Sequence, residues 1–430
     1  MTSEATVAND EVRIPVEAMV GGIHSPGSMS VDFEARVDPA RLRRYRLARA
    51  KEALERSELG ALLLFDVNNV RYVTSTAIGE WSRDKFVRYA LLTRNAEPYI
   101  WDFGSAATHH RLYAPWIDPA HSLAAMSTMR GAVPPAAGLP GALAGEIRDL
   151  LEAEGLWHQP VGVDVADIAT VLALQGAGFD LRDGQQVMLD AREIKSVDEI
   201  LLLSQAAAMV DGAYQEVAEM LRPGVRENEV VALVNEYLYA RGSDDVESVN
   251  AVSGERCIPH PHNFSDRMIR PGDLAFFDVM HAFNGYRTCY YRCFAVGKAS
   301  PAQRDAYRRA REWIDAAIEL VRPGAGTDEI ARIWPAAEEI GLPSEREAFG
   351  LEFGHGLGLA LHERPIVSRL NSLENPAEIK PGMVFALETY CPATDGYSGA
   401  RIEEELVVTA DGPQVITRFP SDELFVTHPY

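Results

Sequence analysis

The sequence predicts a mixed α/β protein with two domains, and three observations lead to this fold class. The first half alternates short apolar strands with amphipathic helices, the pattern of a mixed α/β sheet. From about residue 193 the pattern changes to long helices followed by paired strands. A chain of 430 residues can also form two or three domains with cores of their own. We therefore expect an arm at 1–38, a first domain at 39–192 and a second domain at 193–430.

The elements of the first domain follow from the periodicity of its apolar residues. Apolar residues recur at helical spacing in 39–57, near 141–155 and near 167–178. Short apolar runs bounded by turn residues predict strands at 60–66, 87–93, 96–103, 160–166 and 184–190. The arm at 1–38 is polar and rich in Gly, Ser and Pro, so we expect no regular element there.

The second domain opens with the signature of a helix start. Ser196 is a plausible N-cap, and Glu199 three residues later completes a capping box. A long amphipathic helix is predicted to about residue 221, and a second helix to about 241. The remaining predicted elements are strands at 248–253, 274–283, 286–296, 351–361, 383–390 and 400–409, and helices at 301–321 and 327–340.

Two of these strands form a hairpin whose register can be predicted. Asn284-Gly285 is a strong signal for a two-residue turn, because a type I′ turn needs positive φ at both central residues. That turn places Asp278 opposite Tyr291. Side chains alternate along a strand, so Cys289 should lie on the same face as Asp278, one diagonal step away.

Ionisable side chains interrupt apolar strands at four places in the second domain: Asp278, His355, Glu388 and Glu403. A buried charge is costly unless it is paired or bound to a metal ion. Each residue taken alone is better explained by a hydrogen bond or an ion pair. Three carboxylates and an imidazole together form a ligand set suited to Zn²⁺, Mn²⁺ or Fe²⁺.

Five segments of the second half resemble the pita-bread superfamily, which includes methionine aminopeptidase, aminopeptidase P, prolidase, creatinase and the dimethylsulfoniopropionate lyase DddP. They are IKSVDEI, SDRMIRPGDLAFFD, GHGLGLALHERP, PGMVFALE and RIEEELVVT, in the family order. The first half, from ALLLFDVNNVRYVTS onward, resembles the creatinase-type N-terminal domain of the longer members. The resemblance implies a curved antiparallel sheet in residues 193–430 and a homodimer.

The resemblance also implies a set of metal ligands. Asp278 matches the first aspartate of the family, His355 its histidine, and Glu388 and Glu403 its two glutamates. The second aspartate, which bridges two metal ions in the peptidases, falls on Cys289. A thiol has one sulfur and ionises near pH 8.5 unless its pKa is lowered, so it is a poor bridge between two hard cations.

Three outcomes follow for the metal site. We expect one divalent ion (Mn, Fe or Zn) rather than two, held by His355, Glu388 and Glu403 with Cys289 assisting. Two weakly bound ions are the second possibility. The third is a site without metal in which the acids act as general acid and base, as the resemblance to creatinase allows.

Further candidate residues come from the same resemblance. His362 matches the histidine that contacts the substrate and the developing charge in the peptidases. His260 and His262 flank the position of the catalytic histidine of creatinase, and either one could take its role. Trp81 and Arg83 lie in a loop of the first half that could anchor an anionic substrate, although a plain surface loop is the simpler interpretation.

The leading functional hypothesis is a metal-dependent hydrolase of a C–N bond in a small amide or peptide-like substrate, similar to Xaa-Pro peptidases. Glu388 would serve as ligand and proton shuttle, and His362 would steady the oxyanion. A metal-assisted lyase like DddP is an alternative, weakened because Met280 stands where those lyases carry a further aspartate. Creatinase-like hydrolysis without metal and a non-catalytic binding protein are the remaining alternatives.

The composition indicates which classes of binding partner and which cellular compartment to expect. Lys+Arg 41 against Asp+Glu 63 gives a formal net charge of −22, which argues against nucleic-acid or anionic-membrane partners. Four scattered cysteines without a CxxC motif favour a reducing compartment. The first residues lack the apolar segment of a signal peptide, so we expect a cytoplasmic protein.

Overall fold

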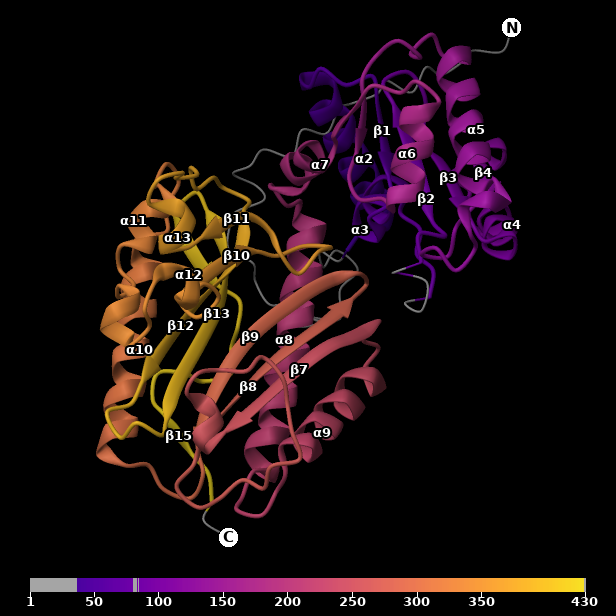
Figure 1. The fold of residues 1–430 in the computed structure, drawn as a ribbon. Helices are drawn as coiled ribbons and strands as arrows, with labels where there is room; N and C mark the ends of the chain where they lie inside the picture. The colour runs from indigo at the N-terminus through magenta and orange to yellow at the C-terminus, as the bar shows by residue number, and fades with distance from the viewer. Residues whose placement is uncertain (1–36, 80–82, 84, 429–430) are drawn as a thin grey trace, which may run out of the picture.

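The computed structural model describes residues 37–79, 83 and 85–428, and Figure 1 shows their arrangement. The predicted arm at 1–38 lies outside the described residues except for its last two positions. The first half of the chain forms one body around a six-stranded sheet, and the second half forms another around two sheets (Figure 1).

The sheet of the first half is mixed, as predicted. Its strand order is β4-β3-β2-β1-β5-β6, with antiparallel pairing of β1–β2 and β2–β3 and parallel pairing of the other neighbours. The strands are β1 Ala61–Leu64, β2 Tyr89–Thr93, β3 Tyr99–Asp102, β4 Ser122–Ala124, β5 Val161–Val163 and β6 Leu181–Asp183. The α-helices are α2 Pro39–Arg56, α3 Val67–Thr74, α4 Gly104–Tyr113, α5 Leu139–Ala153, α6 Ile168–Gly176 and α7 Gln185–Arg192.

The predicted strand at 184–190 is wrong, because this segment belongs to helix α7. The Asp183 side chain accepts hydrogen bonds from the backbone N–H groups of Gln185 and Gln186, which is how a helix start is capped. Met188, Ala191 and Arg192 are buried at helical spacing. Of the adjacent apolar residues at 187–189 only Met188 is buried, so the buried face follows helical spacing and the adjacent apolar residues do not form a strand.

The second half contains a four-stranded sheet of order β15-β9-β8-β7 and a five-stranded sheet of order β11-β10-β12-β13-β14. β13 of the second sheet lies beside β9 of the first, so the two sheets meet along these strands. Pairing is antiparallel throughout except between β15 and β9. The strands are β7 Asp245–Ser253, β8 Leu274–Phe283, β9 Tyr286–Ala295, β10 Phe353–Gly356, β11 Glu363–Val367, β12 Val384–Pro392, β13 Gly399–Thr409, β14 Gly412–Val415 and β15 Phe425–Val426.

Helices cover the outer faces of these two sheets (Figure 1). Helices α8 and α9 pack against the sheet of β7, β8 and β9, and α10 packs against β12 and β13. The α-helices of this half are α8 Val197–Met220, α9 Glu227–Ala240, α10 Pro301–Glu319, α11 Thr327–Ala331, α12 Glu345–Ala348 and α13 Arg369–Ser372. Short 3₁₀ turns lie at Pro119–His121, Pro135–Ala137, Gly254–Cys257 and Ala337–Ile340.

Of the predictions made for the second half, two are confirmed and two are corrected here. The capping box of Ser196 and Glu199 is present, and the hairpin turns at Asn284 and Gly285, both with positive φ. The predicted helix at 327–340 ends at residue 331, because Pro335 supplies no backbone N–H and disfavours the helical conformation before it. The predicted strand at 351–361 ends at residue 356, where the chain leaves the sheet and returns as β11.

Among the described residues no helix is both long enough and apolar enough to cross a bilayer.

Candidate functional site

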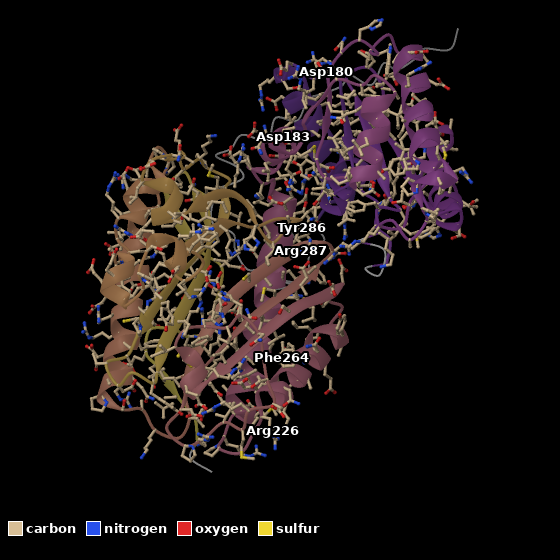
Figure 2. All side chains as sticks on the ribbon, viewed as in Figure 1. Asp180, Asp183, Arg226, Phe264, Tyr286 and Arg287 are labelled. Atoms are coloured by element: carbon tan, nitrogen blue, oxygen red, sulfur yellow. The ribbon has the colours of Figure 1, made fainter. Side chains whose placement is uncertain are left out.

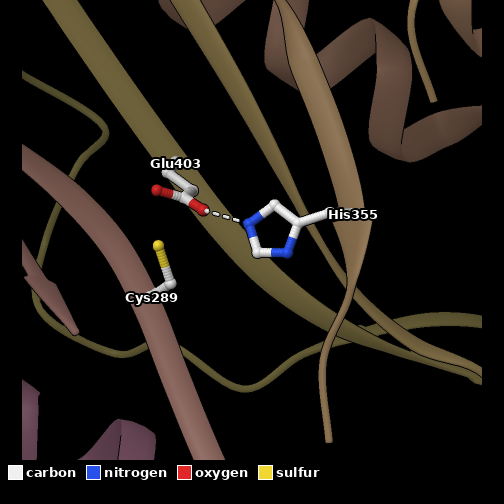
Figure 3. Close-up of side chains that lie close together, drawn as sticks. All are labelled: Cys289, His355 and Glu403. Atoms are coloured by element: carbon white, nitrogen blue, oxygen red, sulfur yellow. Dashed lines mark ion pairs between the residues drawn. The ribbon is translucent and has the colours of Figure 1, made fainter. Parts of the chain in front are cut away.

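Three of the predicted metal ligands meet where the two sheets of the second half adjoin. Cys289 comes from β9, His355 from β10 and Glu403 from β13, and Figure 3 shows the three side chains converging. One donor atom from each lies within 4.8 Å of the other two. All three residues are buried. β9 belongs to the four-stranded sheet, whereas β10 and β13 belong to the five-stranded sheet.

The strand register explains why these side chains share one space. Glu388 on β12 pairs directly with Glu403 on β13, so both side chains project from the same face. β10 pairs with β12 on its other edge, which brings His355 to that face one step along. On the neighbouring sheet, Met280 opposes Cys289 and Asp278 opposes Tyr291, the register predicted from the turn.

The carboxylate of Glu403 is the strongest sign of a cation site. Both of its oxygens are buried and have no hydrogen-bond partner among the described residues. Burial, followed by the nearby acids Glu388 and Asp278, raises the pKa of Glu403 well above its ordinary value. A buried carboxylate without donors is costly, and a divalent cation at this point would satisfy it.

His355 is held in the form that binds a metal ion. Its Nδ1 lies 3.2 Å from the backbone carbonyl oxygen of Gly356, so Nδ1 carries the proton and Nε2 presents a lone pair. Nε2 lies 3.8 Å from a Glu403 oxygen, the contact drawn as a dashed line in Figure 3. Burial, with His362 adding to it, lowers the pKa of His355 to about 3, so the ring is neutral at pH 7.

The other two predicted carboxylate ligands already have partners. Glu388 forms a buried ion pair with Arg401. Asp278 accepts a hydrogen bond from Asn250 Nδ2 at 3.0 Å and lies 3.4 Å from the Cys289 sulfur, which donates to it. Burial raises the pKa of Glu388 to about 7 against the opposing effect of Arg401, and burial also raises the pKa of Asp278. These two acids stand beside the cluster of Cys289, His355 and Glu403 rather than within it.

Two hydrogen bonds to the carboxylate of Glu405 fix the backbone at Cys289. Its backbone N–H donates to Glu405 Oε1 at 2.6 Å, and the hydroxyl of Thr288 donates to the same oxygen at 2.7 Å. Burial, followed by the charge of Asp278, raises the pKa of the Cys289 thiol well above its ordinary value. Without a cation the sulfur is therefore a neutral thiol at pH 7.

The three predicted catalytic histidines lie at different depths. His362 is exposed, with its ring centroid 4.5 Å from that of His355, so it lies at the mouth of the site. His260 is buried, and its Nε2 lies 2.7 Å from the hydroxyl oxygen of Tyr291, the neighbour of Asp278 across the hairpin. His262 is exposed, and its ring is tilted against that of His260 with the centroids 3.9 Å apart. Of the two loop histidines, His260 is the one joined to the site.

The predicted substrate-binding loop of the first half is described only in part. Trp81 lies outside the described residues. Arg83 Nη1 lies 2.8 Å from Glu247 of β7, which also accepts a hydrogen bond from Arg287 of β9 at 2.8 Å. Figure 2 labels Arg287 at the end of the hairpin that faces the first half. Arg83 therefore bridges the two halves of its own chain.

Sequence reasoning missed two buried residues of β13. Arg401 holds Glu388, and Glu405 holds the backbone of Cys289. Both lie two residues from Glu403, and strand alternation places residues i and i+2 on one face. The alternation rule applied to ARIEEELVV would have placed both beside Glu403.

Comparison with known proteins gives the following similarities. Residues 202–410 match metallopeptidase family M24. The probable dipeptidase PepE of Mycobacterium tuberculosis is 32% identical over 244 residues, which cover 56% of this chain and 62% of PepE. The dimethylsulfoniopropionate lyase DddP of Roseovarius nubinhibens is 25% identical over 408 residues, which cover 90% of this chain and 87% of DddP. The match to the first dipeptidase relatives thus spans less than two thirds of their length.

Solved structures show the same fold. Prolidase from Thermococcus sibiricus superimposes with a TM-score of 0.72 at 21% identity, covering 91% of this chain and 100% of that chain. Xaa-Pro dipeptidase from Bacillus anthracis gives a TM-score of 0.71 at 20% identity, covering 90% and 100%. The predicted fold class and the resemblance to the pita-bread superfamily are confirmed.

Proposed function

We propose that the protein is a metal-dependent hydrolase of a C–N bond in a small amide or peptide-like substrate, a proposal supported by the match of residues 202–410 to metallopeptidase family M24. The observation that carries the proposal is the convergence of Cys289, His355 and Glu403, with no hydrogen-bond donor to either Glu403 oxygen among the described residues. We further propose one resident divalent ion (Mn, Fe or Zn) at this cluster, with the predicted ligands Asp278 and Glu388 beside it.

The chemistry of the site follows from the groups around that ion. When bound, a divalent ion supplies Lewis-acid polarisation of the substrate carbonyl and a lowered pKa for the attacking water. Glu388 projects from the same face as Glu403, and burial raises the pKa of Glu388 to about 7, so this carboxyl would accept the proton of that water and pass it to the leaving nitrogen. Arg401 fixes the orientation of Glu388 through their ion pair. His362, at the mouth, is placed to hydrogen-bond the developing oxyanion.

Metal analysis and chelation test the proposal. We expect the purified protein to carry a divalent ion, to lose cleavage of Xaa-Pro dipeptides after dialysis against a chelator, and to regain it when the ion is restored. Glu403→Gln should abolish turnover. Glu404→Gln is the matched control, because Glu404 faces the other side of β13 and pairs with Arg292 at 2.9 Å. Full turnover by the protein after dialysis against the chelator, or by the Glu403→Gln variant, would contradict the proposal.

A second candidate is a metal-assisted lyase acting on a dimethylsulfoniopropionate-like substrate. It is favoured by the extent of the match, since DddP aligns over 90% of this chain and the PepE relatives over 56%. Met280 speaks against it, as noted above. Release of dimethyl sulfide from dimethylsulfoniopropionate, without peptidase activity, would select this candidate. Turnover of creatine by metal-free protein would select the creatinase-like alternative. If none of these substrates is turned over, the non-catalytic binding protein is the remaining candidate.

Several features beyond the reaction complete the proposal. We propose that the chain divides near residue 193, acts as a homodimer, and works in the cytoplasm, where its four cysteines stay reduced. Trp81 and Arg83 remain proposed substrate-binding residues, and His260 or His262 a proposed acid/base group. Light scattering of the full chain tests the dimer, because a single-chain mass would exclude it.

A further inference from the structure

We propose that the site is built for a single thiophilic divalent ion, such as Zn²⁺ or Co²⁺, held by Cys289 Sγ, His355 Nε2 and a Glu403 oxygen. Asp278 and Glu388 lie outside its coordination. The inference rests on the proposed metal dependence and deepens it, because it names the ligands and the class of metal.

The geometry of the three donor atoms fits one ion. Atoms no more than 4.8 Å apart enclose a central point at most about 2.8 Å from each, and zinc bonds to nitrogen, oxygen and sulfur run from roughly 2.0 to 2.3 Å. Small side-chain rotations would close that difference. A three-residue set also leaves a position open for water or substrate, as catalytic zinc sites do.

Charge balance also favours one ion. The Cys289 thiolate and the Glu403 carboxylate carry two negative charges, which neutralise one divalent cation, and the thiol proton is released to solvent on binding. A second ion would depend on Asp278 and Glu388. Arg401 already neutralises Glu388 through a buried ion pair. A second ion would therefore meet only one carboxylate whose charge is not already compensated, that of Asp278.

The sulfur ligand sets the preference among metals. Thiolates favour zinc and other softer ions, whereas carboxylates, carbonyls and water suit Mn²⁺ and Mg²⁺. The strand holds the sulfur in place, because the backbone N–H of Cys289 and the hydroxyl of Thr288 both donate to Glu405. Cys293, four residues along β9, is buried in an apolar core and offers a matched control.

Cobalt substitution tests the proposal through absorption rather than activity. Apoprotein titrated with Co²⁺ should bind one ion per chain and develop a sulfur-to-cobalt charge-transfer band in the near ultraviolet. Cys289→Ser should lose the band and bind Zn²⁺ more weakly by at least roughly 100-fold, because it removes a ligand and even outer-sphere changes cost metal sites up to that much. Cys293→Ser should retain both band and affinity. Glu388→Gln should weaken Zn²⁺ binding by clearly less than Cys289→Ser does, because Glu388 is not a ligand.

A carboxylate in place of the thiol completes the experiment. Cys289→Asp should lose the band, bind two ions and shift its preference toward Mn²⁺. Metal binding by the unmodified protein without the band, two ions per chain, or equal losses of affinity in Cys289→Ser and Glu388→Gln would overturn this inference and leave the proposed hydrolase standing. Absence of any bound ion would overturn the proposed metal dependence itself.

Discussion

Replacing Glu363 by Gln should destabilise the protein by about 3–5 kcal/mol, the cost of removing one partner from a buried ion pair. Glu363 begins β11, and its Oε2 accepts a hydrogen bond from Lys195 Nζ at 2.9 Å. Its Oε1 lies 3.5 Å from Arg192 Nε and accepts a hydrogen bond from the backbone N–H of Ala360 at 3.0 Å. All three charged side chains are at most 2% exposed.

The magnitude follows from what Gln keeps and what it removes. Gln preserves the volume and an oxygen for the Ala360 N–H, so packing and that bond survive. The negative charge is lost, and Lys195 and Arg192 stay buried without their carboxylate. In the double variant Lys195→Met/Glu363→Gln the loss should be smaller than the sum of the two single losses, because one of the unpaired cations is gone.

Urea unfolding followed by far-UV circular dichroism measures this loss. Glu52→Gln is the control, because its ion pairs with Arg49 and Arg56 are surface contacts worth under about 1 kcal/mol. If the free energy of unfolding of Glu363→Gln lies within about 1 kcal/mol of that of the parent protein, the reasoning that the ion pair is buried and isolated from water is refuted.

The same pair predicts a pH dependence. Burial opposes ionisation of Glu363, but Lys195 and Arg192 outweigh it, so the pKa of Glu363 lies below its ordinary value of 4.5. As pH falls, the unfolded chain takes up this proton before the folded one does. The contribution of Glu363 to stability is therefore present above pH 4.5 and is lost below it. The difference between the parent protein and Glu363→Gln should shrink in that acid range; a difference that grows there would contradict the sign.

Three further changes have defined outcomes in urea unfolding. Ser196→Ala removes the capping box of α8 and should cost about 1 kcal/mol, and no loss would mean that the cap is dispensable. Glu404→Gln removes the carboxylate between Arg292 and Arg311 and should cost about 3 kcal/mol while leaving bound metal unchanged; loss of metal would place Glu404 in the site. Tyr214→Phe deletes a buried hydroxyl that lies 2.7 Å from the backbone carbonyl of Phe277 and should cost about 1 kcal/mol, whereas a gain in stability would contradict that hydrogen bond.

Local signals in the sequence were sufficient for the hairpin and for the start of α8. Asn284-Gly285 defined a turn, and the turn defined the register that places Cys289 beside Asp278. The helix at Gln185–Arg192 was missed because its apolar residues are adjacent in sequence. The deciding signal was Asp183, which caps the helix from outside the apolar run.

The partners of the site residues depend on contacts that no local pattern contains. Glu388 and Arg401 meet only because the register of β12 and β13 brings them together. His260 and His262 could not be separated by alternation, since residues two apart share a face. The hydrogen bond between His260 and Tyr291 distinguishes them, and it depends on how the loop folds back over β9.

The donors of the candidate site come from both sheets of the second half, with Cys289 on one and His355 and Glu403 on the other. An ion held by all three would join the sheets at their seam, so the chain could not unfold without releasing it. Excess ion would then raise the melting temperature, with a gain of about 2.7 kcal/mol at 100 times the dissociation constant. Since positions 289 and 403 are far apart along the chain, a fragment lacking either sheet would have no means of retaining the ion.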